Sequence, residues 1–395
     1  MKNKLLFVFF VVFFLCACHK VTQDSKKNII SALQNKYISD NFESYMVYQP
    51  DYCSTLFDNI DVGEIDARYC DISKVDFTKF PEDILNKLSF NSKTVFPAKM
   101  PDWFDLNKID KIGKTPGLNV KKLHAKGITG KGVGLAIIDQ PLSSHQEYKD
   151  NLVYYKNFTR AKEGNMHGAA VSSIAVGKNI GVAPGADLYF IAAKFKVDKR
   201  TQIFDAGPIA EAINHILELN KTLPKENKIA VISISRGFNE NDKDADKFQT
   251  ALQNAQKENI LVLTTNDIMA TSRNGYYANP DDSSLYTHVP TWWIDRSFLK
   301  RSEDIFVPID YRITACETGE SDYAYYADGG FSWGVPYLAG VAALAKQAKP
   351  DLKMKDFISL AIKNADSILV KESTGEEYTI KYFINPTRLI ENLKK

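Results

Sequence analysis

The chain has 395 residues, 44% of them hydrophobic, which is long enough for one large domain with its own core and a smaller appended segment. The formal net charge is +2 at pH 7, so the overall charge gives no reason to expect nucleic acid as a partner. With 21 glycines and 15 prolines, the composition also excludes a low-complexity or disordered chain.

The N-terminus has the pattern of an export signal. Lys2 and Lys4 are followed by the apolar run 5–15, whose 11 residues are too few to cross a bilayer as a helix. The next residues, through Cys18, resemble the lipobox of bacterial lipoproteins. This resemblance implies a signal peptide at residues 1–17 and a lipid group, with palmitate among its acyl chains, on Cys18. Such a group would anchor the exported protein at the bacterial cell envelope. The alternative is an ordinary cleaved secretory signal.

Residues 18–105 are predicted to form an N-terminal appendage, as either a propeptide or a permanent part. Within it, an apolar residue followed by aspartate recurs every five residues, at Ile60, Ile65, Cys70 and Val75. This spacing is typical of a pentapeptide-like coil with the apolar residues pointing inward, and the alternative is a loop with chance spacing.

The cysteines allow two interpretations, because export permits disulfide bonds. With Cys18 lipidated, the mature chain would retain Cys53, Cys70 and Cys316. Either Cys53 and Cys70 form a bridge, or all three are buried thiols. No Cys-x-x-Cys or His-x-x-x-His spacing indicates zinc. The sequence predicts no cofactor and leaves a structural calcium ion open.

Residues 106–395 are predicted to form an α/β domain. Four short, nearly continuous apolar runs are typical of parallel strands covered on both faces, and they lie at 135–138, 188–193, 229–235 and 260–263. Helical stretches between them, 208–220 and 243–258, complete a doubly wound, mostly parallel sheet with helices on both faces. In such a sheet the active site lies at the carboxyl ends of the strands. The polar and aromatic segment 268–306 is expected either to form one wall of the substrate cleft or to cover a sheet edge.

Three short blocks carry the candidate chemistry in the order Asp, His, Ser. Ala-Ile-Ile-Asp ends at Asp139, His-Gly-Ala-Ala begins at His167, and Gly-Gly-Phe-Ser-Trp-Gly-Val-Pro contains Ser332. A serine becomes nucleophilic when a histidine accepts its proton, and an aspartate holds that histidine in the right tautomer. His145 is a competing base, but no run of small residues follows it. The helix-like stretch after Ser332 would favour negative charge at its start, although serine is also a common N-cap.

Ser332 also lies in a Gly-x-Ser-x-Gly motif at residues 330–334. In the hydrolases that use this motif as a nucleophile elbow, the histidine follows the serine. Here the last of the six histidines is His288, so this alternative is excluded.

Together the three blocks resemble the subtilase family of subtilisin-like serine peptidases, over roughly residues 118–349. The resemblance implies a subtilisin-like fold and a serine endopeptidase that forms an acyl-enzyme with its polypeptide substrate. Asp139 would orient the base, His167 would be the general base and Ser332 the nucleophile. The sequence departs from the family pattern in ways that concern substrate fit and turnover more than reaction class, at Gln140, Ala170, Phe331 and Trp333.

The same resemblance implies an oxyanion donor and a substrate-binding edge. The family places an asparagine just after a buried strand, and Asn266 follows such a strand here, although Asp267 stands where the family has glycine. Ser235-Arg236-Gly237 resembles the edge that pairs with an extended peptide, and Gly237 would allow close backbone approach. Arg236 would either attract an acidic substrate residue or remain solvated.

The sequence therefore predicts a lipid-anchored, extracytoplasmic serine endopeptidase. Its partners would be a polypeptide substrate and the membrane that holds its N-terminal lipid, with no nucleic acid. The alternative from another class is a catalytically inactive lipoprotein with a subtilase fold, which would serve as a binding module at the surface.

Overall fold

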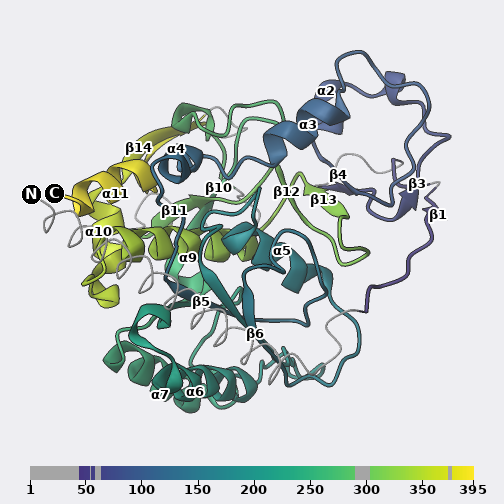
Figure 1. Ribbon diagram of the computed structural model, residues 1–395. Coiled ribbons are helices and arrows are strands. Elements are labelled where there is room, and N and C mark those ends of the chain that lie inside the picture. Colours follow the sequence, from purple (N-terminus) through teal and green to yellow (C-terminus); the bar gives the residue numbers. More distant parts are fainter. Residues whose placement is uncertain (1–43, 54, 58–63, 290–302, 372–375) are drawn as a thin grey trace, which may run out of the picture.

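The computed structural model describes residues 44–395 apart from residues 54, 58–63, 290–302 and 372–375 (Figure 1). The predicted signal peptide and the predicted lipidation site at Cys18 lie outside the described residues. No helix in the described part is both long and apolar enough to cross a membrane.

The centre of the molecule is a parallel sheet with helices on both faces. Its five strands run in the order β6-β7-β5-β8-β9, and every neighbouring pair is parallel. The strands are β5 (Gly134–Asp139), β6 (Leu152–Asn157), β7 (Asp187–Ala192), β8 (Ile229–Ser233) and β9 (Leu261–Leu263). One face is covered by α5 (Met166–Val176) and α9 (Phe331–Ala348), and the other by α6 (Gly207–Thr222) and α7 (Ala245–Lys257) (Figure 1). This arrangement confirms the predicted doubly wound α/β fold.

The residues of β5 show why its sequence is a continuous apolar run. Leu135 and Ile137 belong to the core beneath α5 and α9, whereas Ala136 and Ile138 belong to the core beneath α6 and α7. All four side chains are buried. A strand covered on both faces needs apolar residues at every position, not only at every second one. The strand ends with Asp139 at the carboxyl edge of the sheet.

A second sheet lies in the C-terminal half of the chain, with the order β10-β11-β15-β14. Its strands are β10 (Ile268–Thr271), β11 (Ile305–Pro308), β14 (Asp366–Lys371) and β15 (Glu377–Phe383), and helices α10 (Phe357–Lys363) and α11 (Pro386–Leu393) accompany them. The segment 268–306, interpreted from sequence as a long loop, therefore starts in one strand and ends in another, and the two pair in parallel. The tryptophans that motivated its predicted role, Trp292 and Trp293, lie outside the described residues.

The N-terminal region, residues 44–105, contributes to a third sheet whose order is β12-β13-β4-β2. Strand β4 (Leu88–Asn91) pairs antiparallel with β13 (Tyr323–Tyr326), which lies shortly before Ser332 in the sequence. The outer strands are β12 (Arg312–Ala315) and β2 (Ile65–Asp66). Leu88 shares one hydrophobic core with Ile313 and Tyr325. The N-terminal region is thus packed on the rest of the molecule through a common core.

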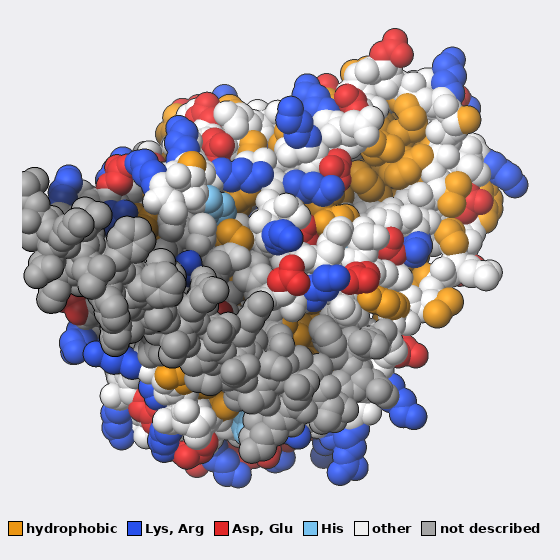
Figure 2. Space-filling view, viewed as in Figure 1, with side chains coloured by type: hydrophobic (Ala, Val, Ile, Leu, Met, Phe, Trp, Pro, Cys, Tyr) orange, Lys and Arg blue, Asp and Glu red, His pale blue; other side chains and the backbone are white. Residues whose placement is uncertain are grey.

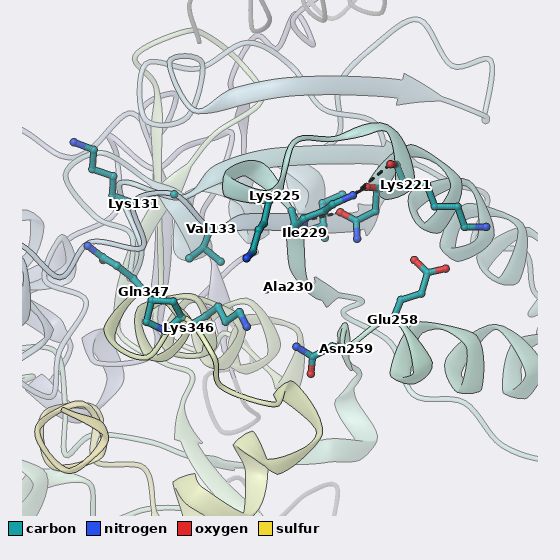
Figure 3. Close-up of a pocket in the computed structure, with 14 residues that line it drawn as sticks. Lys131, Val133, Lys221, Lys225, Ile229, Ala230, Glu258, Asn259, Lys346 and Gln347 are labelled. Atoms are coloured by element: carbon teal, nitrogen blue, oxygen red, sulfur yellow. Dashed lines mark hydrogen bonds between the residues drawn. The ribbon is translucent and has the colours of Figure 1, made fainter. Parts of the chain in front are cut away.

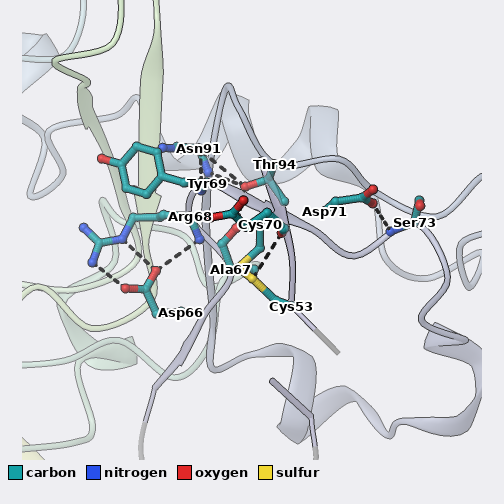
Figure 4. The surroundings of a disulfide bond; sticks show 11 residues. Cys53, Asp66, Ala67, Arg68, Tyr69, Cys70, Asp71, Ser73, Asn91 and Thr94 are labelled. Carbon is teal, nitrogen blue, oxygen red and sulfur yellow. Dashed lines mark hydrogen bonds and ion pairs between the residues drawn. A yellow bond between two sulfur atoms is a disulfide. The ribbon is translucent and has the colours of Figure 1, made fainter. Parts of the chain in front are cut away.

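A disulfide bond joins Cys53 to Cys70, next to the pairing of β1 (Asp51–Tyr52) with β3 (Cys70–Asp71) (Figure 4). Cys316 is a free, buried thiol. Ile65 and Cys70 are both buried, as the five-residue pattern predicts. Their strands belong to different sheets, however, because β2 pairs with β4 and β3 with β1. Successive rungs of a coil would instead pair with each other.

The short helix α2 (Glu82–Leu85) precedes β4, and α3 (Leu106–Gly113) and α4 (Val120–Ala125) connect β4 to β5 of the central sheet. Figure 2 shows hydrophobic side chains gathered on the surface of the N-terminal region, at the upper right. Exposed residues of that region include Val47, Tyr52 and Trp103. Over the rest of the visible described surface, basic and acidic side chains are interspersed, which agrees with the low net charge.

Candidate active site

Asp139 and His167 are brought together by the end of β5 and the start of α5. Asp139 is the last residue of its strand and is 1% exposed. The side chain of Asn165 caps α5 by accepting the His167 backbone N–H at 2.9 Å. The helix approaches closely because Gly168 has no side chain, and a Cβ there would lie 2.5 Å from the carbonyl oxygen of Gln140. The result is a 2.7 Å hydrogen bond between His167 Nδ1 and Asp139 Oδ1.

The surroundings of His167 set the proton affinity of its ring. Burial lowers the pKa of the imidazole. The charge of Asp139 and the hydrogen bond to it raise the pKa by more than burial lowers it, so the net shift is upward from 6.5. With Nδ1 bonded to the carboxylate, Nε2 is the nitrogen left to accept a proton. The indole of Trp333 packs against the ring, with centroids 5.3 Å apart. Sequence reasoning noted Trp333 only as a departure and missed this contact.

Ser332 lies in the first turn of α9, directly after Phe331. Gly330 adopts a positive φ of 62°, which glycine tolerates, and lets the chain turn into the helix. Ser332 Oγ donates to the Ser235 carbonyl oxygen at 3.4 Å, and Ser235 Oγ donates to the Ser332 carbonyl oxygen at 2.8 Å. These contacts hold the start of α9 against the segment that follows β8.

One cavity joins the predicted triad with the predicted substrate edge. It has a volume of about 580 Å³. Its lining consists of Asp139, Gln140, His167, Phe195, Ser235, Arg236, Gly237, Thr265, Gly330, Phe331 and Ser332. The cavity lies where β5, β7 and β8 end, which is the edge at which such sheets place their active sites. A serine hydroxyl, an imidazole and a carboxylate at one cavity can carry out nucleophilic attack with general-base assistance.

The predicted oxyanion donor, Asn266, is bonded to a neighbouring loop. Its Nδ2 donates to the Phe238 carbonyl oxygen at 2.7 Å, and its Oδ1 accepts the Phe238 N–H at 3.1 Å. Thr265, next to it, lines the cavity. Asp267 caps this turn by accepting the backbone N–H and the hydroxyl of Thr264, both at 2.7 Å. The residue that departs from the family's glycine therefore has a structural role.

His145 is a buried histidine with structural partners. Its Nε2 donates to the Asp322 carbonyl oxygen at 2.8 Å, and its Nδ1 accepts the Glu147 N–H at 3.1 Å. Burial lowers the pKa of the ring. His145 is also absent from the described lining of the cavity.

A pair of half-buried carboxylates, which sequence reasoning missed, supports the turn into α9. Asp310 accepts the Gly329 N–H at 2.9 Å and the hydroxyl of Ser272. Asp328 accepts the Gly330 N–H at 3.1 Å. Burial, and then the charge of Asp328, raises the pKa of Asp310, and burial also raises the pKa of Asp328. The Asp-Gly-Gly turn at 328–330 was the signal available in the sequence, whereas Asp310 is distant along the chain.

A second cavity, of about 730 Å³, opens at the opposite edge of the central sheet, where β5 and β8 begin (Figure 3). Its charged lining residues are Lys131, Lys221, Lys225, Lys228, Glu258 and Lys346. Its described lining contains no serine, cysteine or histidine, and no predicted site residue. Within the described residues, no three His, Cys, Asp or Glu side chains are grouped to hold a metal ion.

The model of the subtilase family matches residues 130–287, which include Asp139 and His167 and end before Ser332. The subtilisin-like protease PopC of Myxococcus xanthus is 25% identical over 278 residues, covering 61% of this chain and 57% of PopC. Subtilisin BL of Lederbergia lenta is 24% identical over 236 residues, covering 58% of this chain and 81% of that protein. The match thus spans just over half of the length of PopC.

Among solved structures, the prenylagaramide maturation protease PagA aligns with a TM-score of 0.48 and 15% sequence identity. The alignment covers 69% of this chain and 98% of PagA.

Proposed function

Because this chain belongs to the subtilase family, we propose that it is an extracytoplasmic serine endopeptidase in which Asp139, His167 and Ser332 form the catalytic triad. The family supports a serine peptidase with polypeptide substrates. The observation that carries the assignment of residues is the Asp139–His167 hydrogen bond at a cavity that Ser332 also lines.

The geometry supports a two-step reaction. Ser332 Oγ turns from the Ser235 carbonyl oxygen toward His167 Nε2, gives up its proton to that nitrogen and attacks the carbonyl carbon of the substrate. The tetrahedral intermediate collapses to an acyl-enzyme as His167 returns the proton to the leaving amine. Water, deprotonated by His167, then hydrolyses the ester and restores the serine. Throughout, Asp139 stabilises the imidazolium and keeps its orientation.

The developing oxyanion needs hydrogen-bond donors. Ser332 lies in the first turn of α9, where the backbone N–H groups and the helix dipole favour a developing negative charge. We propose Asn266 as a side-chain donor, and this role requires its amide to turn from the Phe238 carbonyl oxygen into the cavity when substrate binds. The backbone of Ser235 and Gly237 at the rim is proposed to pair with the extended substrate.

We also propose that the chain is a lipoprotein anchored through Cys18. The support is the lipobox-like sequence that follows a short apolar run. Mass spectrometry of the mature N-terminus tests this directly. We expect an acylated cysteine at residue 18. An unmodified N-terminus beyond residue 18 on intact, membrane-extracted protein would leave plain secretion as the route of export.

Hydrolysis of a mixed peptide library tests the proposed peptidase function. We expect the wild-type protein to produce new termini and Ser332→Ala to produce none, with products identified by mass spectrometry. Equal product profiles for the two proteins would contradict the proposal and favour the alternative function, a binding module with a subtilase fold.

A further inference from the structure

Arg236 places a cation at the candidate catalytic cavity. It lines the cavity together with His167 and Ser332. Its guanidinium lies over the ring of Phe204, with 3.8 Å between Cζ and the ring centroid. Phe204 is itself buried in the core beneath α6 and α7. Stacking on a fixed aromatic ring limits the freedom of the long side chain and orients its planar donors.

Among the described residues, the surroundings of Arg236 provide a stacked aromatic ring but no ion pair. The Nε of Arg236 is buried and has no hydrogen-bond partner, and no ion pair to its guanidinium occurs among the described residues. Burial lowers the pKa of the guanidinium, and the charge of Asp242 only partly opposes this. Asp242 accepts the backbone N–H of Asn239 at 3.0 Å. A half-buried cation that lacks a counter-ion gains more from an incoming anion than a solvated one does.

Among the described lining residues, no carboxylate at the cavity is available as a counter-ion for Arg236. Among its described lining residues, the only carboxylate is Asp139, which is bonded to His167. Phe195 also lines the cavity, and its sequence neighbours Lys194 and Lys196 are exposed. The rim beside Phe195 therefore carries basic side chains and no neutralising acid in the lining.

The position of Arg236 relative to the nucleophile is fixed by its neighbours. Ser235 exchanges two hydrogen bonds with Ser332. Gly237 has no side chain, and a Cβ there would lie 2.6 Å from Asn266 Oδ1. A peptide that pairs with this edge would bring its side chains to Arg236 within a few residues of the bond that Ser332 attacks.

We propose that Arg236 makes this site selective for polypeptides that carry an aspartate or glutamate close to the cleaved bond. The proposal rests on the proposed peptidase function and adds a substrate class to it. The acidic side chain would accept hydrogen bonds from the guanidinium, in a charge-assisted and partly desolvated pair.

Matched peptides that differ only in Glu or Gln near the cleaved bond test this selectivity. We expect the wild-type kcat/KM to be about 10- to 100-fold higher for the Glu peptide, as for a hydrogen bond to a charged group. The ratio of the two kcat/KM values is taken within each protein, so differences in the amount of active protein cancel. The Glu/Gln ratio should fall to about 1 in Arg236→Gln. In Arg236→Glu, where the charge at this position is reversed, a matched peptide with Lys in place of Glu should be the better substrate. In about 1 M salt, where charges are screened within ~3 Å, the wild-type preference should shrink.

A control variant removes the same unit of charge elsewhere. Lys257→Gln changes an exposed residue at the end of α7, next to Glu258, which lines the second cavity at the opposite edge of the central sheet. Its Glu/Gln ratio should equal that of the wild type. A wild-type ratio near 1, or a ratio that Arg236→Glu leaves unchanged, would overturn the proposed selectivity.

Binding to the Ser332→Ala protein separates this proposal from the peptidase function. Fluorescence anisotropy with the same labelled peptides should show tighter binding of the Glu peptide, and this difference should be lost with the added Arg236→Gln change. Hydrolysis without any Glu preference overturns the selectivity and keeps the peptidase. Arg236-dependent binding of the Glu peptide without hydrolysis by the wild type overturns the peptidase and keeps the acidic ligand class.

Discussion

The position of His167 is set largely by residues next to it in the sequence. The small residues after it allow α5 to approach the end of β5, and Asn165 caps the helix. The order Asp, His, Ser in the sequence therefore predicted which groups would meet at the cavity. It could not predict that Trp333 packs on the imidazole, because that contact joins two helices far apart in the chain.

Replacing Asp139 with Asn removes the charge that raises the pKa of His167 and keeps the size of the side chain. We expect the His167 pKa to fall, as measured by NMR titration of the imidazole, and kcat to fall by about 10⁴-fold. The base must be neutral, and the neutral form is present above the pKa, so the acid limb of kcat/KM should move to lower pH. Asp351→Asn, an exposed carboxylate, is the control. An unchanged or higher pKa in Asp139→Asn would contradict the assigned role.

Asn266→Ala tests the proposed side-chain donor to the oxyanion. We expect kcat to fall by about 10²- to 10³-fold with a smaller change in KM, which is the size of effect known for loss of one such donor in subtilisin. Steady-state kinetics and denaturant unfolding should be measured on the same samples. A near wild-type kcat combined with lower stability would show that Asn266 serves only to hold the Phe238 backbone.

At the scale of elements, four of the five strands of the central sheet were predicted, because each is an apolar run covered on both faces. The edge strand β6 was not predicted, since it ends in the polar residues Lys156 and Asn157. The third sheet was not, because β4 and β13 pair across more than half of the chain and are four residues long. No pattern in the local sequence predicts such a pairing. Its consequence is that the N-terminal region borders the strand that leads to the turn before Ser332, as a permanent part of the fold would.

Leu88→Ala tests whether the N-terminal region and the rest of the molecule unfold together. Leu88 is 1% exposed, so the substitution should cost about 2–5 kcal/mol of unfolding free energy. Leu369→Ala, at a residue that is 56% exposed, is the matched control and should change stability by less than about 0.5 kcal/mol. We expect one unfolding transition in which the cavity and the N-terminal region are lost together. Separate melting of residues 44–105 would instead indicate a detachable propeptide.

The carboxylate pair beneath the turn into α9 predicts a pH-dependent stability. The raised pKa of Asp310 means that the folded state holds a proton that the unfolded chain releases above about pH 3.9. This contribution is complete below the unfolded pKa and is lost as the pH rises through the folded one. Asp310→Asn keeps an acceptor for Gly329 and cannot ionise. The unfolding free energy of this variant, minus that of the wild type, should therefore be larger at pH 8 than at pH 5. Equal differences at both pH values, in denaturant titrations, would contradict the shift.

At the scale of the whole molecule, the described chain combines a five-stranded central sheet, which has polar residues at its carboxyl edge, with two four-stranded sheets and the β1–β3 pair. The sequence predicted the central sheet and the residues at its edge. The smaller sheets depend on long-range pairings between short strands, and the position of Asn266 on Phe238 depends on the packing of two loops. Such features are decided by tertiary contacts and leave little trace in local sequence.

The most direct measurement for the central claim is covalent labelling with a fluorophosphonate probe, followed by peptide mapping. The probe reacts with a serine that a neighbouring base activates. We predict an adduct on Ser332 in the wild-type protein and none in Ser332→Ala or His167→Ala, with circular dichroism confirming that all three are folded. A folded wild-type protein that stays unlabelled, or that carries the adduct on another residue, would contradict the assignment of Ser332 as the nucleophile.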